Sequence, residues 1–245
     1  MSDEDRVSRR WFDAGELDEL CRPTMDRAIE AIAAGDLERA TELCNGMRYE
    51  WRYLHDLLVD TIAGLITFVQ ERNGEDAVKD AWERGLAKGW REDTAKIVNR
   101  DRRAVVEALA ASWRAHSTSG VGPNPGAFSI EEDDEKFTFR MLPCGSGQRL
   151  WLRGGYEGPN AYGKTQRAHD WSYERADFPL YCTHCTFMNE SLPLKWYGMP
   201  LYPSDPPEDY NHDPCTWYWY KDPADIPEKF RQRYEHSVAG KEHDR

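Results

Sequence analysis

The sequence predicts an α+β protein in which an N-terminal helical bundle is followed by a smaller, irregular β-containing lobe organised by a metal site. Residues 23 to 117 carry apolar residues at helical spacing, whereas the Gly and Pro of STSGVGPNPG (117 to 126) cannot continue a helix. Beyond that segment, short runs alternate apolar and polar residues. We therefore expect a helical bundle domain at 1–118 and a metal-binding β-containing domain at 119–245.

The longest predicted helix covers residues 36 to 72. It begins at Asp36, a suitable N-cap after Gly35, and it ends at Gly74. Its apolar residues recur every three or four positions and mark one face that should pack on the rest of the protein. That face consists of Leu37, Ala40, Leu43, Cys44, Met47, Trp51, Leu54, Leu58, Ile62, Leu65 and Phe68. The same pattern continues to residue 116, so an antiparallel bundle is the expected packing.

The second half of the chain predicts strands joined by proline-rich loops. Residues 136–142 and 148–154 flank the turn sequence PCGSG and predict a β-hairpin, and residues 215–222 predict a further strand. A short helix is expected near the C-terminus, and the Gly-rich residues 153–164 predict a loop.

Composition and charge exclude two classes of partner. The net charge of −12 opposes binding to phosphate backbones, so nucleic acid is not an expected partner. The longest apolar run, residues 60–69, is too short to cross a bilayer, so no membrane association is expected. Six irregularly spaced cysteines do not resemble a secreted disulfide framework. We expect a cytoplasmic protein with reduced thiols.

Four cysteines predict a metal site. Cys182 and Cys185 form a CxxC pair, Cys144 lies in the Gly-rich turn PCGSG, and Cys215 precedes a strand. A CxxC turn brings two thiolates to one ion, and glycines beside a cysteine free backbone amides to hydrogen-bond its sulfur. We predict a tetrahedral site of Cys144, Cys182, Cys185 and Cys215, with zinc as the metal and iron as the alternative. Such a site would tie together loops that have little core of their own.

Other interpretations of these cysteines remain open. They would pack as small hydrophobes if they were ordinary buried thiols. A thioredoxin-like pair needs a βαβ unit, which the pattern does not predict, and covalent haem needs His directly after the second Cys. The shell would be closed with four thiolates, or open if His169, His184 or His212 or a water replaced one of them.

Two His-Asp neighbour pairs are candidates for acid-base catalysis. His55 and Asp56 lie on the long helix, and His169 and Asp170 precede the CxxC pair. An imidazole with a carboxylate partner is poised for proton transfer near neutral pH. We predict that both histidines face one cleft between the lobes. The alternative is that the acids are solvated surface charges and the histidines are hydrogen-bonded boundary residues.

Together these features predict a metalloprotein enzyme of the hydrolase or lyase type. The clustered aromatic residues and Arg149 or Arg153 suit a small aromatic or carboxylate-bearing substrate. No nucleotide-binding or HExxH motif is present in the sequence. The alternatives are a zinc-stabilised interaction module and a small-molecule-binding sensor, both without catalysis. The sequence does not predict the oligomeric state.

Overall fold

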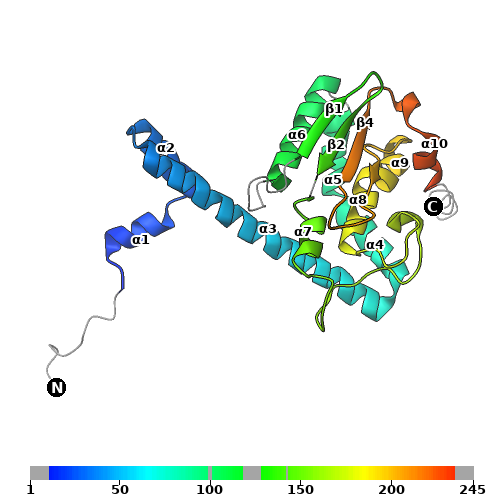
Figure 1. Ribbon diagram of the computed structural model, residues 1–245, viewed down its shortest axis with the longest axis horizontal. Coiled ribbons are helices and arrows are strands. Elements are labelled where there is room, and N and C mark those ends of the chain that lie inside the picture. Colours follow the sequence, from blue (N-terminus) through cyan, green and yellow to red (C-terminus); the bar gives the residue numbers. More distant parts are fainter. Residues whose placement is uncertain (1–10, 99–100, 118–127, 142, 235–245) are drawn as a thin grey trace. The chain divides into compact units, whose positions relative to one another are not determined.

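The computed structural model describes residues 11–98, 101–117, 128–141 and 143–234 (Figure 1). The chain divides into two compact units, Met1–Trp51 and Arg52–Arg245, and the division falls within the longest helix, α3 (Leu37–Asn73). The domain boundary predicted at residue 118 lies outside the described residues. Within the second unit, helices before this boundary share hydrophobic cores with the β-containing part.

The first unit is a small helical assembly. It contains α1 (Ala14–Cys21), α2 (Thr24–Ala33) and the first part of α3. Asp13 and Glu16 cap α1, because each side chain accepts a hydrogen bond from the other residue's backbone N–H, at 2.8 and 2.7 Å. Gly35 turns the chain between α2 and α3 with a φ of 78°, a backbone conformation that favours glycine. Small side chains then let the two helices pack, at Ala28, Ala31, Ala40 and Leu43.

In the second unit, the predicted long helix is confirmed by the remainder of α3. Gly74, with a φ of 83°, separates it from α4 (Glu75–Leu86), and α5 (Gly89–Val98) and α6 (Arg102–Ser117) follow. The packing face of α3 differs from the prediction. Val59, Ala63 and Ile66 are buried, whereas most of the predicted apolar face, including Leu58 and Leu65, is exposed.

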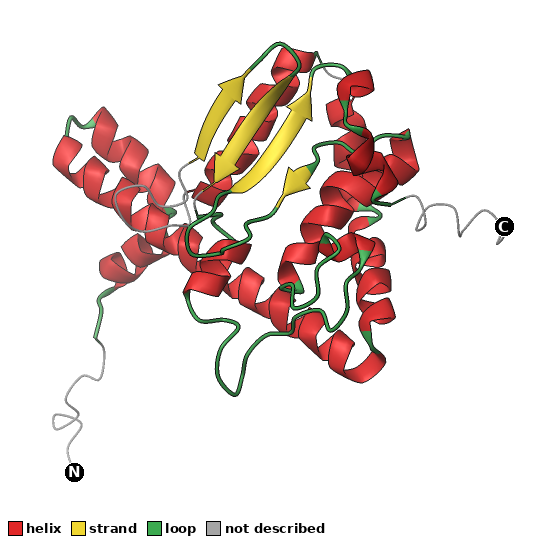
Figure 2. Cartoon of the chain, turned by 45° about the vertical axis from the view of Figure 1, so that its right-hand side comes forward, coloured by secondary structure: helices red, strands yellow, loops and turns green. Residues whose placement is uncertain are grey.

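The sheet has four antiparallel strands in the order β1-β2-β4-β3. These are β1 (Phe128–Glu132), β2 (Lys136–Met141), β3 (Ser204–Asp205) and β4 (Cys215–Tyr220). Phe139 lies opposite Trp217, and Met141 lies opposite Cys215. Alternate residues of β2 and β4 form one core with α6, which lies behind the strands in Figure 2. That core contains Val105, Leu109, Trp113, Phe139, Met141, Trp217 and Trp219. The mixed composition of helix and antiparallel sheet confirms the α+β class, and β4 confirms the predicted strand.

The predicted hairpin around PCGSG is wrong. Residues 147–152 form a helix, α7 (Gly147–Leu152), and the hairpin partner of β2 is β1. Strand periodicity would place Leu150 and Leu152 on one face, but Leu150 is 1% exposed and Leu152 is 48% exposed. Six residues are too few for the alternation to distinguish strand from helix, and the burial of Leu150 beside α3 decided between them.

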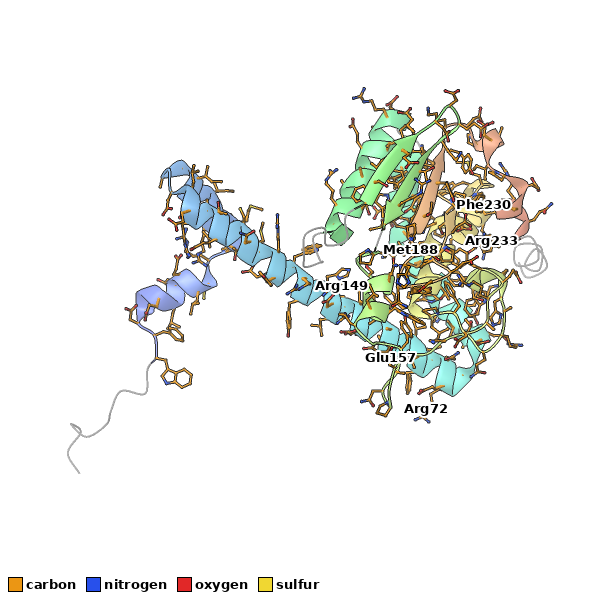
Figure 3. The ribbon with its side chains drawn as sticks, in the orientation of Figure 1. Arg72, Arg149, Glu157, Met188, Phe230 and Arg233 are labelled. Atoms are coloured by element: carbon orange, nitrogen blue, oxygen red, sulfur yellow. The ribbon has the colours of Figure 1, made fainter. Side chains whose placement is uncertain are left out.

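Short helical segments connect the remaining parts. They are η2 (Asp170–Ser172), η3 (Tyr181–Thr183), α8 (His184–Thr186), η4 (Phe187–Ser191), α9 (Leu192–Tyr197), η5 (Pro223–Asp225) and α10 (Glu228–Gln232). The last of these is the predicted C-terminal helix, and residues 153–164 form a loop whose tip carries Glu157 (Figure 3). Among the described helices, none combines the length and the apolar composition that crossing a bilayer needs.

A buried carboxylate holds the C-terminal segments in place. Glu190, on η4, is 0% exposed and accepts hydrogen bonds from the N–H and the hydroxyl of Ser204, both at 2.9 Å. Arg233 and Tyr234 donate to its other oxygen, at 2.8 and 2.9 Å. This cluster fixes the helical segment that follows the CxxC pair to β3 and to the end of the described chain, where Figure 3 labels Arg233.

Candidate functional site

The four cysteines of the predicted metal site border one cavity in the second unit. Cys144 lies in the turn before α7, Cys182 on η3, Cys185 on α8 and Cys215 at the start of β4. The cavity has a volume of about 120 Å³. Three separate stretches of chain therefore bring their thiols to one enclosed space, although within the described residues no group of three or more His, Cys, Asp or Glu is arranged to hold a metal ion.

Gln148 fixes the turn that carries Cys144. This side chain is 2% exposed, and its Oε1 accepts a hydrogen bond from the backbone N–H of Cys144 at 2.9 Å. Its Nε2 donates to the carbonyls of Tyr210 and Asp213, at 2.8 and 2.9 Å. Because those carbonyls belong to the loop that leads into Cys215, one buried amide sets the relative position of two of the thiol-bearing segments.

The CxxC pair is held by local hydrogen bonds. The backbone N–H of Cys182 donates to the carbonyl of Pro179 at 3.0 Å. His184 Nδ1 lies 2.5 Å from the carbonyl of Tyr181 and must carry the proton, since a carbonyl only accepts. In the neutral ring, Nε2 is then an acceptor, and it lies 3.4 Å from Cys185 Sγ. His184 also lines the cavity itself, beside Cys185.

Gly147 allows the close approach of Cys182. A Cβ atom at position 147 would lie 2.5 Å from Cys182 Sγ and 3.5 Å from the Tyr181 ring. Any side chain at position 147 would therefore displace the Cys182 sulfur from its position beside the turn that carries Cys144.

The thiols influence one another's protonation. Burial, together with a smaller contribution from the nearby Cys144, raises the pKa of Cys182 to about 12. Burial also raises the pKa of Cys185 and of Cys215, and in both cases neighbouring cysteines of the group add to the effect. All four sulfurs line one cavity, so their charges would interact if they were ionised.

Two buried donors beside the thiols lack hydrogen-bond partners. Tyr210 Oη and Trp217 Nε1 line the same cavity, and neither makes a hydrogen bond of acceptable geometry. Tyr210 interacts with Cys182, and Trp217 interacts with Cys215. Each donor partly offsets the rise in the pKa of its thiol. A thiolate is a better acceptor than a thiol, so both donors suit sulfurs that carry negative charge.

The predicted catalytic residues lie in two separate clusters. His55 Nε2 lies 2.9 Å from Ser146 Oγ, and His55 Nδ1 lies 3.4 Å from Asp56 Oδ1. Arg149, on α7 and labelled in Figure 3, donates hydrogen bonds to Asp56 at 2.8 and 3.2 Å. Burial raises the pKa of Asp56, but the bonds from Arg149 and the charge of Arg153 outweigh it, so that this pKa is lowered.

The second cluster centres on His169 and Glu75. His169 Nε2 lies 2.7 Å from Glu75 Oε2, and the imidazole stacks on Trp171 with ring centroids 4.3 Å apart. Asp170, the predicted partner, instead accepts a hydrogen bond from the backbone N–H of Trp171 at 2.8 Å. Neither His169 nor His55 lines the four-cysteine cavity, although Ser146 does.

Two further predicted binding groups also have partners within the chain. Arg149 pairs with Asp56, and Arg153 pairs with Asp60 at 3.1 Å, so that both guanidinium groups already bind carboxylates. His212, an alternative metal ligand in the sequence prediction, is exposed and pairs with Asp209 at 2.6 Å.

Sequence reasoning missed Ser146, Gln148 and Glu75. The PCGSG turn offered a signal for Ser146, because the hydroxyl of a serine in a Gly-rich turn can hydrogen-bond a residue that is distant along the chain. Glu75 had no such signal, since its partner His169 lies far along the chain.

Comparison with protein-family models, with curated proteins and with solved structures gave no match.

Proposed function

We propose that this chain is a zinc-binding protein in which Cys144, Cys182, Cys185 and Cys215 hold one structural Zn²⁺ ion. The observation that carries the proposal is the convergence of four thiols, from three stretches of chain, on one small cavity. Four cysteines form the donor set typical of closed structural zinc sites, and iron is the alternative metal for the same set. Such a site needs reduced thiols, which suits a cytoplasmic protein.

The surroundings of the thiols support a bound cation. Burial, with a contribution from the neighbouring cysteines, raises the pKa of Cys185 and of Cys215, and a divalent cation among the sulfurs would favour their thiolate forms. The unpaired donors of Tyr210 and Trp217 would hydrogen-bond the charged sulfurs. Because the sulfurs border the cavity without forming a coordination shell, binding requires the cysteine side chains to turn towards its centre.

The size of the cavity favours an ion over an organic substrate. A cavity of roughly 150 Å³ holds one benzene molecule, and the four-cysteine cavity is smaller, at about 120 Å³. Four sulfurs around one ion would occupy this space. We therefore favour the zinc-stabilised interaction module over an enzyme with an enclosed site for a small aromatic molecule.

Metal analysis of purified protein tests the proposal. We expect one zinc per chain in the wild type, and loss of zinc in Cys182→Ser. Cys44→Ser is the matched control, because Cys44 is exposed on α3 in the first unit. The absence of stoichiometric metal in the wild type, or full metal content in Cys182→Ser, would refute the site.

The structural role has its own measurement. Metal-binding free energy becomes folding free energy where the metal ties together loops. Removing zinc with a chelator should therefore lower the melting temperature of the second unit while the far-ultraviolet helical signal largely persists, and adding zinc back should restore it. An unchanged thermal transition after complete removal would contradict a structural role.

One observation favours a second candidate, a hydrolase. Ser146 Oγ, His55 Nε2 and the Asp56 carboxylate form a continuous chain of contacts, and Ser146 lines the cavity. In this order, His55 would accept the proton of Ser146 as the hydroxyl attacks an ester carbonyl, and would pass it to the leaving alcohol as the ester bond breaks. Water would then hydrolyse the acyl-serine, while Asp56 would orient the imidazole. Ser146→Ala should abolish turnover of small activated esters while zinc content stays constant. Equal turnover by Ser146→Ala and the wild type would exclude this candidate.

A further inference from the structure

The α3 stripe is an uncharged apolar surface on the second unit. We give this name to the seven large side chains that α3 exposes over about four turns. They are Tyr53, Leu54, Leu57, Leu58, Ile62, Leu65 and Phe68. Their exposed fractions range from 36% to 75%. Asp56 and Asp60, the acidic residues of this fully described segment, pair instead with Arg149, on α7, and with Arg153, the residue after α7.

The opposite face of α3 already has its partners. Val59 and Ala63 pack with Leu150 and Tyr156, and Ile66 packs with Val78 and Trp82. The stripe therefore does not belong to the core of the second unit. An apolar surface of this extent on a helix marks a contact with another molecule.

We propose that the α3 stripe binds the α3 stripe of a second copy of this chain, with the two helices antiparallel across a twofold axis. The sequence order of the stripe supports this pairing. Around an axis at Thr61, Leu54 faces Phe68 of the other copy and Leu57 faces Leu65, so that these large apolar residues meet. Ile62 faces Asp60, whose carboxylate pairs with Arg153. Thr61 itself is exposed and meets its own counterpart.

The area of the stripe matches what a dimer requires. A fully exposed side chain of this size presents on the order of 150 to 200 Å². Seven side chains that are about half exposed then present roughly 550 to 750 Å² on each copy. Two copies together bury more than the roughly 1,000 Å² that a specific interface needs.

The charge of the chain points to the same surface. With a net charge of −12, two copies repel each other, and an acidic surface would strengthen the repulsion where they meet. The stripe is free of ionised side chains, so two copies approach there at the lowest electrostatic cost. This inference rests on the interaction role proposed for the chain and not on the zinc site.

Sedimentation equilibrium of the purified full chain tests the dimer. We expect a wild-type dimer and a dissociation constant at least about a hundredfold larger for Leu57→Glu/Leu65→Glu. Ile130→Glu is the matched control, because Ile130 is an exposed apolar residue on β1, outside the stripe. A monomeric wild type, or an equally strong dimer in the stripe variant, would overturn the proposal.

Cross-linking tests the antiparallel register without adding charge. In a Cys21→Ser/Cys44→Ser background, which removes the two exposed thiols, Thr61→Cys should form a disulfide-linked dimer on mild oxidation, whereas Ile130→Cys should not. Failure of Thr61→Cys to cross-link would overturn the register. Zinc content is measured on the same samples, so a failed dimer with one zinc per chain refutes only the stripe, and a dimer without zinc refutes only the metal site.

Discussion

Gly147→Ala should weaken zinc binding, because it places a methyl group against one of the proposed ligands. The new Cβ would lie 2.5 Å from Cys182 Sγ, whereas ordinary contacts begin at 3.4 Å. The sulfur must therefore move by about 0.9 Å, the difference between these two distances. A metal-ligand distance tolerates only about 0.2 Å of change, so a methyl group this close restricts the positions from which the Cys182 sulfur could reach a metal ion in the cavity.

The expected magnitude follows from the cost of overpacking. An extra methyl group in a tightly packed site costs about 1 to 3 kcal/mol. If this cost is borne by the zinc-bound state, zinc affinity falls by roughly 5- to 150-fold, at 1.4 kcal/mol for each factor of ten. Competition with a coloured chelator at fixed pH measures the change in affinity.

Gly85→Ala is the matched control for this prediction. Gly85 lies on α4, and a Cβ there would meet no atom within 4 Å. Alanine is favoured over glycine in a helix by about 1 kcal/mol, so this variant should be at least as stable as the wild type and bind zinc equally well. Wild-type zinc affinity in Gly147→Ala would refute the assignment of Cys182 as a ligand beside this turn.

Two further predictions concern stability. Glu190→Ala removes the buried carboxylate that pairs with Arg233, whose side chain is 14% exposed and keeps the longer contact with Asp205, at 3.8 Å. This change should lower the free energy of unfolding by about 3 to 5 kcal/mol in urea titrations. Glu131→Ala, at an exposed pair, should cost less than about 1 kcal/mol, and equal effects would contradict the buried pair. Burial raises the pKa of Glu75, but bonds from His169, the Gln166 N–H and Gln70 outweigh it and lower this pKa. A lowered carboxyl pKa stabilises the fold above its unfolded value, near 4.5, and this stability is lost as the pH falls through the folded pKa. Glu75→Gln should therefore flatten the loss of stability below about pH 4.5, and an unchanged acid profile would show that Glu75 is not responsible.

The sequence by itself determined the elements whose signals are local. Asp36 and Gly74 define the limits of α3, because capping and a positive φ depend on a few neighbouring residues. The alternation of CTWYWY predicted β4, since one face of that strand is buried against α6. The sequence also grouped Cys144, Cys182, Cys185 and Cys215, because turn-forming neighbours distinguish them from the helical Cys21 and Cys44.

The tertiary structure decided which partners the side chains found. Periodicity shows which residues share a face of a helix, but not whether that face is covered, and so the apolar face of α3 was predicted to be packed and is exposed. The partners of His55 and His169 are Ser146 and Glu75, which lie 91 and 94 residues away along the chain. No local pattern encodes such a pairing, because it depends on how α3, α4 and the loops pack. The physical reason is that local energies select an element, while burial and long-range hydrogen bonds select its neighbours.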